Sequence, residues 1–102
     1  MNTTDKIAVT SRSFSTNKYL VDALRAKYSN ITLNNTGKTL KGSDLLQFLE
    51  GQNKVIVGLE DFNQDLINNL PELNVISKFG VGLNNIDIKA LVDKKIALGF
   101  TP

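Results

Sequence analysis

The sequence predicts an α/β fold: a flavodoxin-like, parallel five-stranded sheet in the order 2-1-3-4-5, with helices on both faces. Short apolar runs that are typical of buried strands begin near residues 6, 31, 54, 75 and 96. Each gap between two of these runs holds one helical pattern. This regular alternation favours right-handed crossovers and therefore parallel strands.

In the first half of the chain, residues 6–10 are apolar and predict a strand buried on both faces. Residues 11–17 form a hydroxyl-rich loop whose side chains can cap a helix. Residues 31–33 predict a second strand near an edge of the sheet, because the run is short and polar on one side. The helix between them is expected to bury a face made of Leu20, Ala23, Leu24 and Tyr28.

The third helix and strand carry clear boundary signals. Ser43 is a candidate N-cap for a helix that buries Leu45, Phe48 and Leu49. Gly51 stands where a left-handed residue ends such a helix. Residues 55–57 are the most strand-like triplet in the chain.

Two further units complete the pattern. Asp61 with Gln64 resembles a capping box for a short helix that Pro71 ends. The residues expected to mark this helix are Leu66, Ile67 and Leu70, and those of the last helix are Ile88, Leu91 and Val92. Residues 75–78 and 96–99 are the fourth and fifth predicted strands.

Residues 75–87 form a strand that runs into a glycine loop, with Asp87 near the start of the next helix. Such a loop presents backbone N–H groups that suit a small anion, and Lys78 adds positive charge. A glycine turn without a ligand stays open as an alternative. A dinucleotide fingerprint is disfavoured, because Asn85 occupies its third glycine position and no acidic residue follows about 20 positions on.

Composition excludes several functional classes. Lys plus Arg number 12 and Asp plus Glu 10, so the net charge of +2 implies neither nucleic acid nor a membrane surface as a partner. The chain has no Cys and no His, which removes thiolate chemistry and the usual proton shuttle and metal ligand. We expect no metal site. A polar N-terminus and the lack of a long apolar run predict a cytoplasmic protein.

Residues 73–87 resemble the substrate-domain signature of NAD-dependent D-2-hydroxyacid dehydrogenases. Residues 9–14 and 57–60 are similar to members often labelled phosphoglycerate dehydrogenase. The resemblance implies a flavodoxin-like domain over residues 1–102 that binds the substrate's carboxylate and provides one wall of the cleft. The substrate-binding positions that it implies are Lys78, Phe79, Gly80, Val81, Gly82, Leu59 and Glu60.

The resemblance also implies that NAD binding and the catalytic groups lie outside these residues. NAD would serve the full-length enzyme and would not bind to this segment. A missing nucleotide-binding domain would supply the catalytic groups, so no catalytic residue is expected here and the chain alone should be inactive. Its other partner would be a small 2-hydroxy or 2-keto acid, and a homo-oligomer stays open.

Two departures from the family pattern bear on the substrate. Asn84 stands where aspartate is usual, and residues 58–61 lack an arginine for phosphate. Glu60 and Asp61 are expected to repel a phosphate such as that of 3-phosphoglycerate. The competing hypothesis is a free-standing flavodoxin-like module that binds a small anion or a protein partner.

Overall fold

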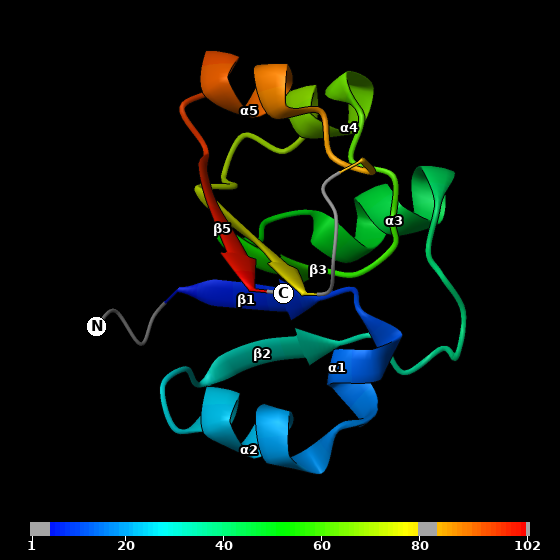
Figure 1. Ribbon diagram of the computed structural model, residues 1–102, viewed down its shortest axis with the longest axis vertical. Coiled ribbons are helices and arrows are strands. Elements are labelled where there is room, and N and C mark those ends of the chain that lie inside the picture. Colours follow the sequence, from blue (N-terminus) through cyan, green and yellow to red (C-terminus); the bar gives the residue numbers. More distant parts are fainter. Residues whose placement is uncertain (1–4, 80–83, 102) are drawn as a thin grey trace.

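The computed structural model describes residues 5–79 and 84–101, with no side-chain account of residues 100 and 101. In this part of the chain the strands form one parallel sheet in the order β2-β1-β3-β4-β5, which confirms the predicted topology (Figure 1). The strands are β1 (Lys6–Val9), β2 (Asn30–Leu33), β3 (Lys54–Val57), β4 (Val75–Phe79) and β5 (Ala97–Thr101).

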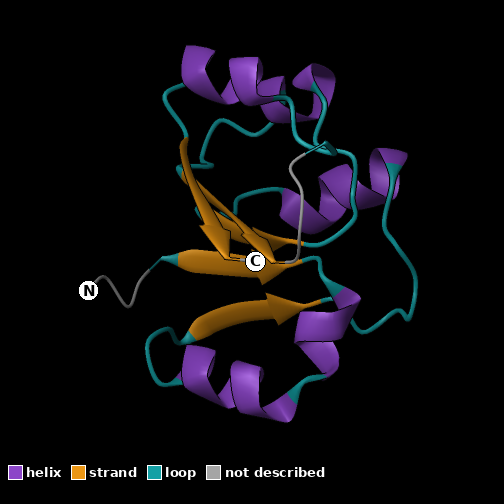
Figure 2. Cartoon of the chain, viewed as in Figure 1, coloured by secondary structure: helices purple, strands orange, loops and turns teal. Residues whose placement is uncertain are grey.

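Helices cover both faces of the sheet, as predicted (Figure 2). Two of them pack beside β1 and β2, and the other three lie on the opposite side. In chain order the helices are α1 (Arg12–Thr16), α2 (Lys18–Arg25), α3 (Gly42–Leu49), α4 (Gln64–Asn68) and α5 (Ile88–Asp93). None of the described helices is long and apolar enough to cross a membrane.

Burial along each strand follows its place in the sheet. The run of buried residues Ile7, Ala8 and Val9 belongs to β1, which lies between two other strands and under helices on both faces. The edge strand β2 instead alternates exposed and half-buried residues, as its polar pattern predicts. In β3 the fully covered positions are Val55 and Val57. The pattern of apolar residues therefore matches the two-sided covering of the sheet.

The apolar core has two parts, one on each face of the sheet. The larger part joins α3, α4 and α5 to the sheet through buried side chains such as Leu49, Ile67, Ile76 and Leu91. The smaller part packs Val9, Phe14 and Val21 together, so α1 and α2 share one contact surface with β1. Burial of this apolar area is the main favourable term in folding.

Three boundary predictions were wrong. Residues 12–16 form α1 rather than a loop, with Ser11 Oγ accepting a hydrogen bond from the Phe14 N–H. Ser43 is not the N-cap of α3: the helix begins two residues earlier than predicted, after the N-cap residue Lys41, which makes no side-chain cap. Asp61 does not cap α4, because Phe62 pairs with Ile86 in a parallel bridge and keeps the backbone extended there. Asn63 is the N-cap instead.

Two predicted helix faces were also partly wrong. In α2 the buried residue is Val21, flanked by half-buried Leu20 and Leu24, whereas Ala23 is exposed. In α5 the residues that face the core are Ala90 and Leu91. Ile86, just before α5, fills the position expected of Ile88, so Ile88 and Val92 turn outward. The register of a short helix is thus decided by its anchoring residues more than by its own pattern.

At the amino end of the sheet, Lys54 ties β3 to segments that are distant in sequence. Its Nζ atom donates to Tyr28 Oη at 3.1 Å and lies 3.3 Å from Asp5 Oδ2. The hydrogen bond to Tyr28 raises the pKa of the Lys54 ammonium above its ordinary value of 10.5; Asp5 adds to the rise and burial opposes it. The charged form of Lys54 therefore stabilises the fold.

We expect the Lys54→Met variant to lose about 0.5 kcal/mol of unfolding free energy near neutral pH. Because the pKa is higher in the folded state, this contribution is complete below the unfolded pKa and disappears as pH rises through the folded one. Urea unfolding of wild type and variant at about pH 8 and above about pH 11 measures the change. Exposed Lys27→Met is the control, and an equal difference at both pH values would contradict the assignment.

Phe62 is fully buried in the larger core. We expect Phe62→Ala to lower the unfolding free energy by about 3–5 kcal/mol, because it removes an aromatic side chain and leaves a cavity. Tyr19→Ala, at a position 83% exposed, should change it by no more than about 0.5 kcal/mol. Urea denaturation followed by circular dichroism makes the comparison. Similar losses in both variants would show that Phe62 is not a core anchor.

Candidate functional site

The carboxyl ends of three neighbouring strands meet at one edge of the sheet. The parallel register pairs Val9 of β1 with Ile56 of β3, and Val57 of β3 with Lys78 of β4. The segments that leave these strands therefore lie together, although they come from distant parts of the sequence. Ligands of open parallel α/β sheets collect at this edge.

Lys78 is buried at the end of β4, with 2% of its surface exposed. Its Nζ atom donates a hydrogen bond to the Gly58 carbonyl oxygen, just beyond β3. Asn85 Nδ2 donates to the same carbonyl at 3.1 Å and to the Glu60 carbonyl at 2.7 Å. The β3–α4 connection is thus held by two side chains from the segment around the glycine loop.

Glu60 is the second buried charge of this edge, also 2% exposed. Its Oε1 atom accepts a hydrogen bond from Thr10 Oγ1 at 2.6 Å and another from the Gly58 N–H at 3.0 Å. The carboxylate and the Lys78 ammonium consequently contact opposite ends of Gly58. Buried charged groups are tolerated when hydrogen bonds replace water, and both Lys78 and Glu60 form such bonds here.

Backbone hydrogen bonds join the same two connections further out. The Phe62 N–H donates to the Asn85 carbonyl at 2.8 Å, and the Asp87 N–H donates to the Phe62 carbonyl at 2.9 Å. Asp87 Oδ1 in turn accepts from the Ala90 N–H at 3.1 Å, so it caps α5 as its position in the sequence predicts. The start of α5 and the end of the β3–α4 connection therefore form one framework.

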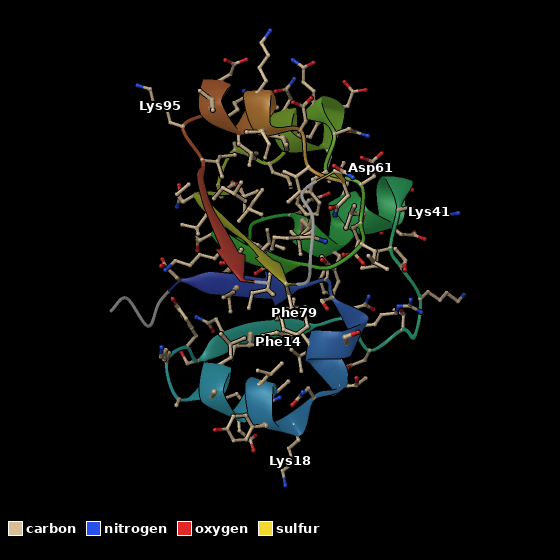
Figure 3. All side chains as sticks on the ribbon, in the orientation of Figure 1. Phe14, Lys18, Lys41, Asp61, Phe79 and Lys95 are labelled. Atoms are coloured by element: carbon tan, nitrogen blue, oxygen red, sulfur yellow. The ribbon has the colours of Figure 1, made fainter. Side chains whose placement is uncertain are left out.

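The structure places the sequence-predicted binding residues in different surroundings. The Phe79 ring packs edge-on against Phe14, with ring centroids 5.3 Å apart at 86° (Figure 3). Leu59 projects into solvent with 73% of its surface exposed, whereas Lys78 and Glu60 are buried. The predicted positions Gly80, Val81 and Gly82 lie outside the described residues. Binding by any of these residues stays a prediction.

Three polar residues of this edge were missed by sequence reasoning. Thr10 and Asn85 hold Glu60 and Gly58, and Asn34 Nδ2 donates to the Thr10 carbonyl at 3.0 Å. From the sequence alone, Asn85 is notable only as the residue at the third glycine position of a dinucleotide fingerprint. Polar residues next to predicted strand ends were the available signal, but the partners named here are 24 to 50 residues away in sequence.

The edge contains a small cavity of about 40 Å³. It is lined by Ser11, Arg12, Ser13, Thr39, Gly58, Leu59 and Glu60. This volume is far below the roughly 300–1,000 Å³ of pockets that hold cofactors or drug-sized ligands. Among the described residues no group of three or more acidic side chains is placed to hold a metal ion.

Gly58 is needed where β1 and β3 end side by side. A Cβ atom built on it would lie 2.9 Å from the Ser11 Cα, closer than real Cβ contacts allow. We expect Gly58→Ala to lower the unfolding free energy by about 1–3 kcal/mol, because backbone must move to admit the methyl group.

The matched control is Gly99→Ala, where the nearest atom is the Ser77 Oγ at 3.3 Å. That substitution should be neutral or stabilise the strand by no more than about 1 kcal/mol. Urea unfolding of both variants distinguishes the sites. Equal behaviour would mean that the Ser11–Gly58 contact does not constrain the fold.

Solved structures that resemble this chain are considerably longer. The NAD⁺-bound 3-phosphoglycerate dehydrogenase of Entamoeba histolytica matches at a TM-score of 0.76 and 22% identity, covering 96% of this chain and 33% of that one. The D-lactate dehydrogenase of Escherichia coli matches at 0.77 and 18%, covering 95% and 31%. These chains share the fold, and the present chain spans about a third of their length.

A Polaromonas sp. JS6 66 protein assigned to the NAD-binding D-isomer specific 2-hydroxyacid dehydrogenases matches at a TM-score of 0.83 and 23% identity, over 92% of this chain and 29% of that one. None of the curated proteins matches the sequence. The family model for the catalytic domain of D-isomer specific 2-hydroxyacid dehydrogenases matches residues 7–102. This match covers nearly the whole chain, which therefore belongs to the D-isomer specific 2-hydroxyacid dehydrogenase family.

Proposed function

We propose that this chain is the substrate-binding part of an NAD-dependent D-2-hydroxyacid dehydrogenase. The whole enzyme would interconvert a 2-hydroxy acid and its 2-keto acid by hydride transfer. The observation that carries the proposal is the buried Lys78, which donates to the Gly58 carbonyl at the carboxyl edge of the sheet. The match of residues 7–102 to the family model is the second support for the proposal.

The proposed task of this part is recognition of the substrate's carboxylate. Main-chain N–H groups of residues 79–82 would donate to the carboxylate oxygens, as the family resemblance implies. Lys78 would favour an anion there, because its charge is buried and only weakly screened by solvent. The Gly58–Asn85 hydrogen bond would keep the neighbouring loop in place. Orientation of the substrate before hydride transfer is the contribution assigned to these residues.

NAD does not fit the cavity at the carboxyl edge of the sheet. Thr10 and Ser11 after β1 are buried, and Ser11 packs directly against Gly58. The adjoining cavity of about 40 Å³ is too small for a dinucleotide. We therefore assign NAD binding and the proton-transfer groups to a nucleotide-binding domain outside these 102 residues. Leu59, an exposed apolar residue at the edge, would be covered when the two domains close.

Titration of the ¹⁵N-labelled chain with D-lactate tests carboxylate recognition. The amides of Gly80 and Gly82 should shift in a saturable way, since they would donate to the carboxylate. The Gly51 amide, which lies near the amino end of β3, is the internal control and should not move. No saturable shift at Gly80 and Gly82 would sink the proposal.

A second measurement concerns catalysis by the chain alone. The purified 102-residue chain should not oxidise NADH in the presence of a 2-keto acid, because it has no His for proton transfer and the proposal assigns NAD binding to another domain. Measurable turnover would contradict the assignment of NAD binding to another domain.

A further inference from the structure

A groove runs between α3 and α4, on the face of the sheet that carries the larger part of the core. It consists of two hollows of about 350 and 330 Å³, which share Leu46 and Asn69 as lining residues. One hollow lies toward the amino ends of the two helices and the other toward their carboxyl ends. The floor is apolar, formed by buried Leu45 and Leu66 and half-buried Leu46. The groove therefore follows α3 over its length of roughly 12 Å.

The rim of this groove is acidic, although the chain has a net charge of +2. Four carboxylates line it, whereas no lysine or arginine does so among the described residues. Within the part of the chain that the structure describes, none of the four forms an ion pair. The four residues, all exposed, are Glu50, Asp61, Asp65 and Glu72. An apolar floor between free carboxylates suits a partner surface that is apolar and basic at once.

Helix α2, on the opposite face of the sheet, presents a surface of this kind (Figure 1). Tyr19 is the most exposed large apolar side chain among the described residues, at 83%. The helical repeat places exposed Ala23 next to Tyr19, one turn further along, so the two form a ridge. In Figure 3 the Lys18 side chain projects away from the molecule beside this ridge. The charged residues around the ridge are three basic ones and one acidic one: Lys18, Arg25, Lys27 and Asp22.

The ridge and the groove match in shape and in charge. Helices pack by placing the ridge of one helix into a groove on another surface. The α2 ridge would bury the Tyr19 ring on the apolar floor and bring its cations to the carboxylates of the rim. Helices α2 and α3 have 8 residues each, so the ridge and the groove are similar in length.

We propose that the α2 ridge docks into the α3–α4 groove of a second copy of this chain. The two surfaces lie on opposite faces of one molecule, so the association is head to tail and each pair keeps one free ridge and one free groove. A single helix in one groove is a small interface, and the dissociation constant is therefore expected on the order of 0.1–1 mM. Neither surface contains Lys78 or Glu60, so the inference is independent of the proposed function.

Amide spectra of the ¹⁵N-labelled chain, recorded between about 0.05 and 2 mM protein, test the docking. The amides of residues 18–27 and those of residues 42–50 and 61–72 should shift together, with one dissociation constant. The shifts should shrink in about 0.5 M NaCl, because salt screens exposed charges. The amide of Val92, exposed on α5, is the internal control and should not move.

Two charge reversals block the two surfaces separately. Arg25→Glu changes the ridge and Asp65→Lys changes the groove. Each should weaken self-association about tenfold or more, because it brings like charges together. A mixture of the two variants should regain the wild-type affinity, since the intact ridge of Asp65→Lys meets the intact groove of Arg25→Glu. In that mixture, ¹⁵N-labelled Asp65→Lys should shift at the amides of α2.

Lys89→Glu and Asp93→Lys are the matched controls, because they make the same charge changes at exposed positions of α5. Both should keep the wild-type self-association, which separates a local contact from a general effect of charge. Tyr19→Ala should weaken the association about fivefold, because it removes the aromatic anchor of the ridge. Urea midpoints verify that every variant is folded.

Spectra that do not depend on concentration up to about 2 mM would overturn the inference. Self-association that Arg25→Glu and Asp65→Lys leave unchanged would do the same, as would a mixture of these variants that stays monomeric. A monomeric wild type whose groove amides shift with a synthetic amphipathic helix of leucine and lysine would assign the groove to another protein and equally overturn docking of a second copy. The proposed function is tested separately, by the D-lactate titration.

Discussion

The close approach of Gly58 to its neighbours is the constraint on which the carboxyl edge of the sheet depends. The Gly58 backbone packs directly against Ser11, which leaves no room for a Cβ atom. The Gly58 N–H donates a hydrogen bond to the Glu60 carboxylate, and its carbonyl accepts hydrogen bonds from Lys78 and Asn85. One residue without a side chain thus joins the connections that follow β1, β3 and β4. A side chain at this position would separate the strand ends that the site needs together.

The two buried charges at this edge have a structural cost that their partners offset. Lys78 and Glu60 would each be expensive to remove from water, but both form hydrogen bonds to the same short segment. Such an arrangement holds the β3–α4 connection in one conformation, because shifting it would leave a charge without a partner. Rigidity of this kind is useful beside a substrate, where misplaced groups reduce the rate.

The edge therefore has an inner and an outer layer of charge. The inner layer, Lys78 and Glu60, is buried and maintains the shape of the loops. The outer layer is Arg12, which is exposed and lines the same cavity as Gly58. Under the proposed function, the inner layer would stabilise the loops beside the carboxylate site.

The sequence by itself determined the α/β class, the strand order and the family, because strand-length apolar runs, regular spacing and the signature around residues 73–87 are local properties. It also identified Asp87 as a helix cap, since capping acts over three residues. Only the tertiary structure decided that Asn63 replaces Asp61, that Glu60 turns inward, and that Arg12 joins residues 58–60. Those outcomes depend on contacts between strand ends far apart in the chain, which no local pattern encodes.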